Sequence, residues 1–131
     1  MWATVARELG WDEDFQFAGS DIEFSWRAQL AGYGIGYASG AVIWARAPDD
    51  LRTLARQWFR YGASGGKLFR EFHHRGMPRS RFRRAMREWA WLLVHTSDVC
   101  SAGEAQRHWV RRVSYRAGRV AGSARARVFY L

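Results

Sequence analysis

The stretch GSDIEFSWRAQLAGY, residues Gly19 to Tyr33, predicts one amphipathic helix with acidic residues at its start and glycine at its end. Ser20 precedes Glu23 by three residues, which is the spacing of a capping box: the serine oxygen accepts from the amide of Glu23, and the Glu23 carboxylate accepts from the amide of Ser20. Gly32 supplies a left-handed stop. We therefore predict a helix over about Asp21 to Ala31, with Ser20 and Glu23 as its structural cap.

Asp21 has no place in that capping box. An acid in the first turn stabilises a helix through the macrodipole by about 0.3–1 kcal/mol. A carboxylate that faces a substrate can also act as a general base. The residues alone leave both interpretations open. One side of the predicted helix carries Ile22, Trp26, Gln29, Leu30 and Tyr33.

The segments on either side of this helix are shorter. Before it we predict a helix over about Trp2 to Leu9, ended by Gly10 and followed by the acidic aromatic loop WDEDFQFAG. After it, GIGYASGAVIWARA has β-branched and aromatic residues on both sides of Ser39-Gly40. This pattern predicts two short strands, near Ile35–Tyr37 and Val42–Trp44.

Helical periodicity dominates the rest of the chain. Pro48-Asp49-Asp50 opens a long helix whose apolar residues are Leu51, Leu54, Ala55, Trp58 and Phe59. The glycines at 62, 65 and 66 are expected to weaken or bend it. Two basic amphipathic helices follow the loop HHRGMPRS, the second beginning near Gln106. Their apolar sides carry Phe82, Met86, Trp89, Ala90 and Leu93 in the first, and Val110, Val113, Ala117, Val120, Ala124 and Val128 in the second.

Composition and charge limit the possible functions. The chain has 131 residues, of which 48% are hydrophobic and 16% aromatic, so it has the apolar surface for a modest core and is not a disordered chain. Residues 1–50 carry a net charge of −5 and residues 51–131 carry +14, and 20 of the 21 basic residues are arginine. Arginine suits phosphate oxygens, so the basic part predicts an anionic partner, which can be a nucleotide, a lipid headgroup or a nucleic acid.

Several other kinds of site are not supported. The longest apolar run, Trp89 to Val94, is far shorter than the roughly 20 residues that span a bilayer. The N-terminus lacks the features of a secretion signal, so we expect a cytoplasmic protein. Cys100 is the only cysteine, and the pair His73-His74 has no third ligand nearby in sequence, so we predict no metal site in this chain.

Two motifs carry a resemblance to a known family. GSDIEFSWRAQLAGY is similar to a stretch like GEDVDLSWRLQLAGY in family 2 glycosyltransferases, and Gln57-Trp58-Phe59-Arg60-Tyr61 looks like their Gln-x-x-Arg-Trp element with Tyr last. The resemblance covers about Arg7 to Pro78, and more loosely RAGRVAGSARARVFYL at the end. Ser20 stands where the family usually has an acid, and Trp44 where relatives often have a histidine.

The family consists of inverting enzymes with a GT-A fold, so the resemblance implies an α/β fold. This chain would be a mainly helical fragment, the C-terminal portion, with two short strands and long basic amphipathic helices. Residues 1–78 would form the acceptor side of the catalytic domain, and residues 79–131 a basic helical tail. The nucleotide-binding strands and the family's Asp-x-Asp metal motif belong to the N-terminal half, so the chain is expected to be a truncated product or one part of a split enzyme.

The resemblance also implies roles for individual residues. Asp21 falls on the catalytic base, while Gln57, Trp58, Arg60 and Tyr61 fall on a substrate-binding element near the acceptor and the donor pyrophosphate. The expected partners are a nucleotide-sugar donor, a glycan or lipid-linked acceptor and a separate N-terminal half. The expected cofactor is Mg²⁺ or Mn²⁺, with ligands outside this chain.

The alternative is a small arginine-rich module that binds an anionic membrane surface or nucleic acid. The arginines recur opposite apolar stripes, and no helix-turn-helix or zinc-finger spacing occurs, so nucleic acid is the less favoured partner. Membrane binding is compatible with the first interpretation, because a basic tail can hold an enzyme near a lipid-linked acceptor. We therefore expect a peripheral location at the inner face of the plasma membrane.

Overall fold

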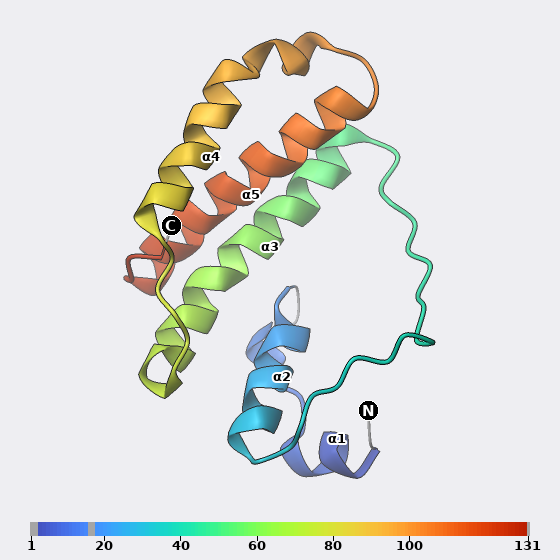
Figure 1. Ribbon diagram of the computed structural model, residues 1–131, viewed down its shortest axis with the longest axis vertical. Helices are drawn as coiled ribbons and strands as arrows, with labels where there is room; N and C mark the ends of the chain where they lie inside the picture. Colours follow the sequence, from blue (N-terminus) through green and yellow to red (C-terminus); the bar gives the residue numbers. More distant parts are fainter. Residues whose placement is uncertain (1–2, 16–17, 131) are drawn as a thin grey trace. The chain divides into compact units, whose positions relative to one another are not determined.

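The computed structural model describes residues 3–15 and 18–130, which are mainly helical (Figure 1). The chain forms two compact units, Met1–Arg46 and Ala47–Leu131. The boundary between them coincides with the change from acidic to basic composition near Pro48. The mainly helical character was predicted correctly. The functional division after residue 78 stays a prediction.

The first unit contains α1 (Ala3–Leu9), a 3-10 turn η1 (Glu13–Phe15) and α2 (Ser20–Leu30). α1 ends at Gly10, which adopts a left-handed φ of 63°, as predicted. The predicted start at Trp2 and the loop residues 16–17 lie outside the described residues. Val5 of α1 and Phe24 and Ala28 of α2 form the core of this unit, with Ala6, Leu9 and Tyr33 packed against them.

α2 buries a different side from the one that its sequence suggested. Ile22 and Leu30 are exposed, whereas Phe24 is buried and stacks on Trp11 with ring centres 4.9 Å apart. Tyr33 does pack on the core, and its hydroxyl donates to the Glu8 carboxylate at 2.5 Å. That hydrogen bond raises the pKa of the Tyr33 phenol, because the ionised phenolate could not donate it. The Phe24 side of α2 is buried, in place of the predicted side, because α1 packs against it.

The predicted capping box is not formed. Gly19 is the N-cap of α2, with a left-handed φ of 86°, and its carbonyl accepts from the Glu23 amide at 2.8 Å. No side chain caps this end, and Ser20 is already inside the helix. The reason is that the Glu23 carboxylate turns into the core to meet Arg27, so it cannot reach back to Ser20.

Ser20→Ala should therefore have little effect on stability. Because the Ser20 side chain does not cap the helix, its removal breaks no capping hydrogen bond. We therefore expect the free energy of unfolding to change by less than about 0.5 kcal/mol. Urea denaturation followed by circular dichroism measures this change. A loss of about 1 kcal/mol or more would show that Ser20 caps the helix after all.

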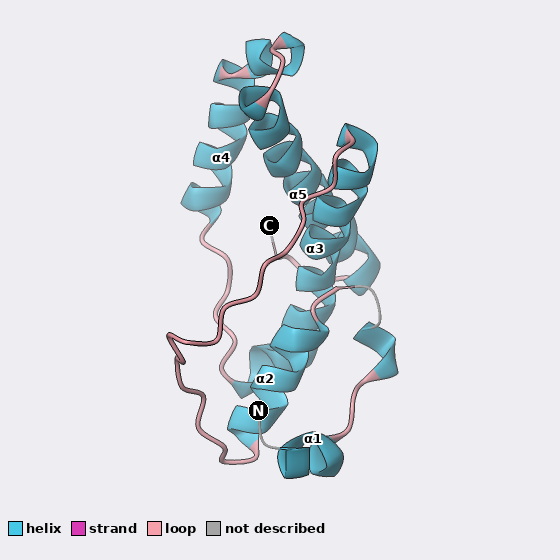
Figure 2. Cartoon of the chain, turned by 90° about the vertical axis from the view of Figure 1, so that its right-hand side faces the viewer, coloured by secondary structure: helices cyan, strands magenta, loops and turns pink. Residues whose placement is uncertain are grey.

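The two predicted strands are absent from the described part of the segment between the helices. Residues 34–48 form a loop with a turn at Ser39-Gly40, and Figure 2 draws no strand there. Tyr37 and Trp44 are each 94% exposed. A strand needs a neighbour to receive its backbone hydrogen bonds, and no described residue supplies one. The extended segment therefore remains a loop.

The second unit contains α3 (Leu51–Phe72), η2 (His73–Arg75), α4 (Phe82–Val94), η3 (Thr96–Cys100) and α5 (Glu104–Ala126). These are the three long helices predicted from periodicity. α3 and α5 lie side by side and run in the same direction (Figure 1). α4 comes between them in the sequence and runs in the opposite direction. At the start of the pair, the guanidinium of Arg107 donates to the backbone carbonyls of Pro48 and Asp49.

The glycines at 62, 65 and 66 do not interrupt α3, which is continuous from Leu51 to Phe72. Gly62 and Gly66 of α3 are buried against α5, where Gly118 and Gly122 are buried in turn. A Cβ atom at Gly62 would lie 2.1 Å from the carbonyl oxygen of Tyr115. Glycine at these four positions lets the two backbones touch, so the small residues form the helix interface. Val120, which belongs to the apolar stripe predicted for α5, is exposed.

Asp50 caps the N-terminus of α3. Its Oδ1 accepts from the backbone amide of Thr53 at 2.7 Å, so the predicted start at Pro48-Asp49-Asp50 is confirmed. The hydrogen bonds from Thr53, that of its amide first, lower the pKa of the Asp50 carboxyl because they favour the ionised form. Residues Leu51 to Phe72 then extend without interruption.

Asp50→Ala should lower the melting temperature of the second unit in a pH-dependent way. The folded-state pKa of Asp50 is depressed, so its stabilising effect is present above the unfolded-state value of about 4 and is lost as pH falls through the folded-state pKa. We expect the difference from the wild type to be full at neutral pH and to vanish in acid. Asp50→Asn, which caps without a charge, is the control. A difference that does not depend on pH would contradict the ionised cap.

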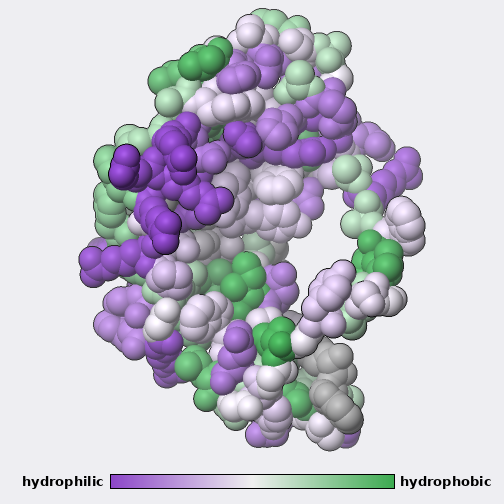
Figure 3. Space-filling view, viewed as in Figure 1, coloured by the Kyte–Doolittle hydropathy of each residue, from purple (hydrophilic) through white to green (hydrophobic). Residues whose placement is uncertain are grey.

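α4 packs on α5 through only part of its surface. Ala85 and Leu92 are buried, and the indole N–H of Trp109 on α5 donates to the Leu92 carbonyl at 3.1 Å. The Arg112 guanidinium of α5 lies 4.2 Å from the centre of the Trp91 ring. In Figure 3, hydrophilic and hydrophobic residues adjoin at the left-hand edge, where α4 lies. The contact with α5 thus leaves another side of α4 facing solvent.

Candidate functional site

Asp21 is placed in the first turn of α2 with an exposed side chain. Its backbone carbonyl accepts from the Ser25 hydroxyl at 2.7 Å, but no hydrogen bond or ion pair to its carboxylate occurs within the described residues. The carboxylate is therefore accessible to a molecule that approaches α2 from solvent.

Glu23, two residues later, is in the opposite situation. It is buried, and both of its carboxylate oxygens accept from Arg27, one turn further along α2; Nη2 of Arg27 lies 3.0 Å from Oε2. The same guanidinium also donates to the carbonyls of Leu9 and Gly10, so the pair connects α2 to the end of α1. Glu23 thus has a structural role. Sequence reasoning missed Arg27, although the Glu–Arg spacing of four residues is the signal for such a pair.

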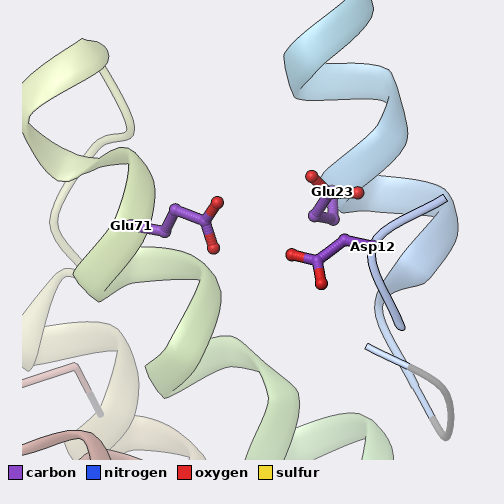
Figure 4. A group of neighbouring side chains, drawn as sticks. All are labelled: Asp12, Glu23 and Glu71. Carbon is purple, nitrogen blue, oxygen red and sulfur yellow. The ribbon is translucent and has the colours of Figure 1, made fainter. Parts of the chain in front are cut away.

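Two neighbouring carboxylates of the first unit, those of Asp12 and Glu23, are engaged in internal bonds. The carboxylate oxygens of Asp12 and Glu23 approach within 4.8 Å, and Figure 4 shows both side chains; Glu71, also drawn there, belongs to α3 of the second unit. Both oxygens of Glu23 are bonded to Arg27, and Oδ1 of Asp12 accepts from the amide of Asp14 at 2.8 Å. A cation would have to displace a guanidinium. Asp12-Glu13-Asp14 has the Asp-x-Asp spacing, but the Asp12 carboxylate stabilises a turn by accepting the Asp14 amide.

The Gln-x-x-Arg-Tyr element lies on α3, and three of its residues contact one another. Nε2 of Gln57 donates to the Tyr61 hydroxyl at 2.9 Å. The ring of Trp58 meets Tyr61 edge-on, with ring centres 5.7 Å apart, and also lies 6.3 Å from Tyr115 of α5. Gln57, Trp58 and Tyr61 therefore form one aromatic and amide-bearing cluster on the surface of the second unit.

Arg60 belongs to a different surface of the same helix. It lines a groove between α3 and α5, of about 380 Å³, together with Ala55, Arg56, Phe59, Val113, Ser114 and Ala117. Arg56 and Arg60 are one helical turn apart on the edge of this mainly apolar groove. Sequence reasoning missed Arg56, whose signal was its spacing of four residues from Arg60. Two guanidinium groups at one groove can bind an anion such as a phosphate.

Among the described residues, no helix is long and apolar enough to cross a membrane.

The comparisons with known proteins identify the family. Residues 2–118 match the family model described as glycosyl transferase family group 2. No match was found among curated proteins or among solved structures. The matched region extends beyond Pro78, where we expected the closer part of the resemblance to end, and includes α4 and most of α5. Because it spans most of the chain, the protein belongs to glycosyl transferase family group 2.

Proposed function

We propose that the chain serves in the inverting transfer of a sugar from a nucleotide-sugar donor to an acceptor, with Asp21 as the general base. The acceptor hydroxyl attacks the anomeric carbon opposite the leaving nucleoside diphosphate. A bond forms between that oxygen and the carbon, and the bond to the phosphate oxygen breaks with its electron pair. The hydroxyl proton passes to the Asp21 carboxylate.

The contrast between Asp21 and Glu23 carries this proposal. The two acids lie on the same helix, but Glu23 is buried and neutralised by Arg27, whereas the Asp21 carboxylate is exposed and has no hydrogen-bond or ion-pair partner within the described residues. A general base must reach the proton that it removes, and only the exposed acid can do so without unfolding the helix. The family match supports a transferase role for this stretch.

The second unit supplies the proposed substrate contacts. Arg60, with Arg56 beside it, donates hydrogen bonds to the departing diphosphate and stabilises its growing negative charge. Trp58 and Tyr61 offer aromatic faces to the sugar or the acceptor, and Gln57 orients the Tyr61 hydroxyl. The acceptor is a glycan or a lipid-linked molecule.

Donor binding is assigned to a partner. We propose that a separate N-terminal half, of the kind known from the family, holds the nucleotide and the Mg²⁺ or Mn²⁺ ion, because the first unit engages its neighbouring carboxylates in internal bonds. A divalent ion there would stabilise the charge of the diphosphate. No step is assigned to metal ligands of this chain.

The test is sugar transfer with and without this chain. The N-terminal half of a family member is mixed with the purified chain, a panel of labelled nucleotide-sugars and glycan or lipid-linked acceptors. We expect transfer only when both parts are present, and a product whose anomeric configuration is opposite to that of the donor. Transfer that does not depend on this chain, or a product that retains the donor configuration, would overturn the proposal.

A further inference from the structure

The outward side of α4 exposes several large apolar side chains. Phe82 is 56% exposed and Leu93 is 76% exposed, and Met86 and Val94 are exposed as well. At 100° per residue, Phe82, Met86, Ala90 and Leu93 fall within about a quarter of the helix circumference. This is the apolar side that the sequence predicted, and α4 instead packs on α5 through Ala85 and Leu92. The helix presents its apolar stripe to solvent.

Arginines border this stripe along one side. Arg83 and Arg87 follow Phe82 and Met86 around the helix, and Arg81, Phe82, Arg83, Arg84 and Arg87 together line a hollow of about 710 Å³. None of these four arginines has an ion pair within the described residues. Glu88, the only acid of α4, lies within 4 Å of both Arg112 and Arg116 of α5. It therefore pairs with arginines of α5 and does not neutralise the four arginines at the start of α4. The cationic groups at the start of α4 are available to an external anion.

We infer that α4 is a membrane-surface helix, which lies flat on an anionic lipid bilayer. The stripe Phe82, Met86 and Leu93 enters the boundary between headgroups and acyl chains, and Arg83 and Arg87 bind lipid phosphates beside it. The helix has 13 residues and is therefore about 20 Å long, too short to span a bilayer but long enough for several lipid contacts. This inference does not depend on sugar transfer.

Charge and apolarity together distinguish this partner from nucleic acid. Arginines alone would serve either, since both present phosphate oxygens. Nucleic acid offers no medium for aliphatic side chains such as Met86, Leu93 and Val94, whereas a bilayer interface does. The apolar stripe and the bordering arginines occupy the same exposed surface, so one partner must bind both. An anionic membrane offers acyl chains to the stripe and phosphates to the arginines.

The experiment measures binding of the full chain to vesicles. Flotation is carried out with neutral phosphatidylcholine vesicles and with vesicles in which about one third of the lipid is phosphatidylglycerol. Binding should require the anionic lipid and decrease as salt rises from about 0.1 M to about 1 M. Phe82→Ser/Leu93→Ser should weaken binding about tenfold without any change in charge, because it removes the inserted groups. Circular dichroism checks that each variant is folded.

A matched pair of charge variants completes the design. Arg83→Gln/Arg87→Gln should weaken binding about tenfold or more, whereas Arg52→Gln/Arg70→Gln, which removes two exposed arginines from α3, should change it at most about twofold. Equal losses for the two pairs would mean that only net charge matters and would overturn the inference. So would wild-type binding by Phe82→Ser/Leu93→Ser, or binding to single-stranded RNA with no binding to anionic vesicles.

Discussion

Gly62→Ala and Gly118→Ala are each expected to destabilise the second unit by about 3 kcal/mol, at the upper end of the range for an overpacked core. A Cβ atom at Gly62 would lie 2.1 Å from the Tyr115 carbonyl oxygen, and one at Gly118 would lie 2.1 Å from the Phe59 carbonyl oxygen. Both obstacles are backbone atoms of the facing helix, so no side chain can rotate away. α3 and α5 must separate, and the buried contacts between them are weakened together.

Gly65→Ala is the matched control for these two variants. Gly65 lies in α3 as well, but its added methyl group would meet only the ring of Tyr130, at 3.4 Å. Alanine is favoured over glycine within a helix by about 0.5–1 kcal/mol, so this variant should be neutral or slightly more stable. The free energy of unfolding is measured by urea denaturation. If Gly62→Ala also gained stability, helix propensity would be the dominant effect and the two backbones could not be in contact.

These glycines show why the sequence predicted the helices but not their packing. Apolar periodicity identified α3, α4 and α5, because a helix places every third or fourth residue on one side. The same rule assumes that the apolar side is the buried side. In α5 the closest contacts with α3 are made by Gly118 and Gly122, which have no side chain to bury. The pattern of valines therefore predicted a different side of α5 as the buried one. Close backbone contact is a property of two helices together, and one stretch of sequence does not show it.

The region around Asp21 was predictable to a similar degree. The helix Ser20–Leu30 and its acidic start followed from local residue preferences. Local preferences did not predict that Glu23, and not Asp21, would form an ion pair. Its partner Arg27 also binds the carbonyls of Leu9 and Gly10, which α1 positions. The capping box and the Glu23–Arg27 pair compete for one carboxylate. A guanidinium with several acceptors within the folded unit is the stronger partner, and Glu23 turns toward it.

Of the two acids, Glu23 is held by Arg27, whereas the Asp21 carboxylate has no hydrogen bond or ion pair in the described residues. Asparagine at position 21 keeps the size of the side chain and suits the start of a helix, but it cannot accept a proton at neutral pH. Asp21→Asn should therefore leave the melting temperature nearly unchanged. Glu13→Gln, which removes another exposed acid of the first unit, is the control for the change in charge.

If Asp21 is the base, Asp21→Asn should lower kcat for sugar transfer by about 10²–10⁴-fold, which is the usual contribution of general base catalysis, while donor binding persists. Glu13→Gln should retain wild-type turnover. Both variants are measured with the N-terminal half supplied and with the donor at saturation. An Asp21→Asn protein with near-normal turnover would assign this carboxylate to the helix dipole, because a dipole contribution affects stability and leaves proton transfer untouched.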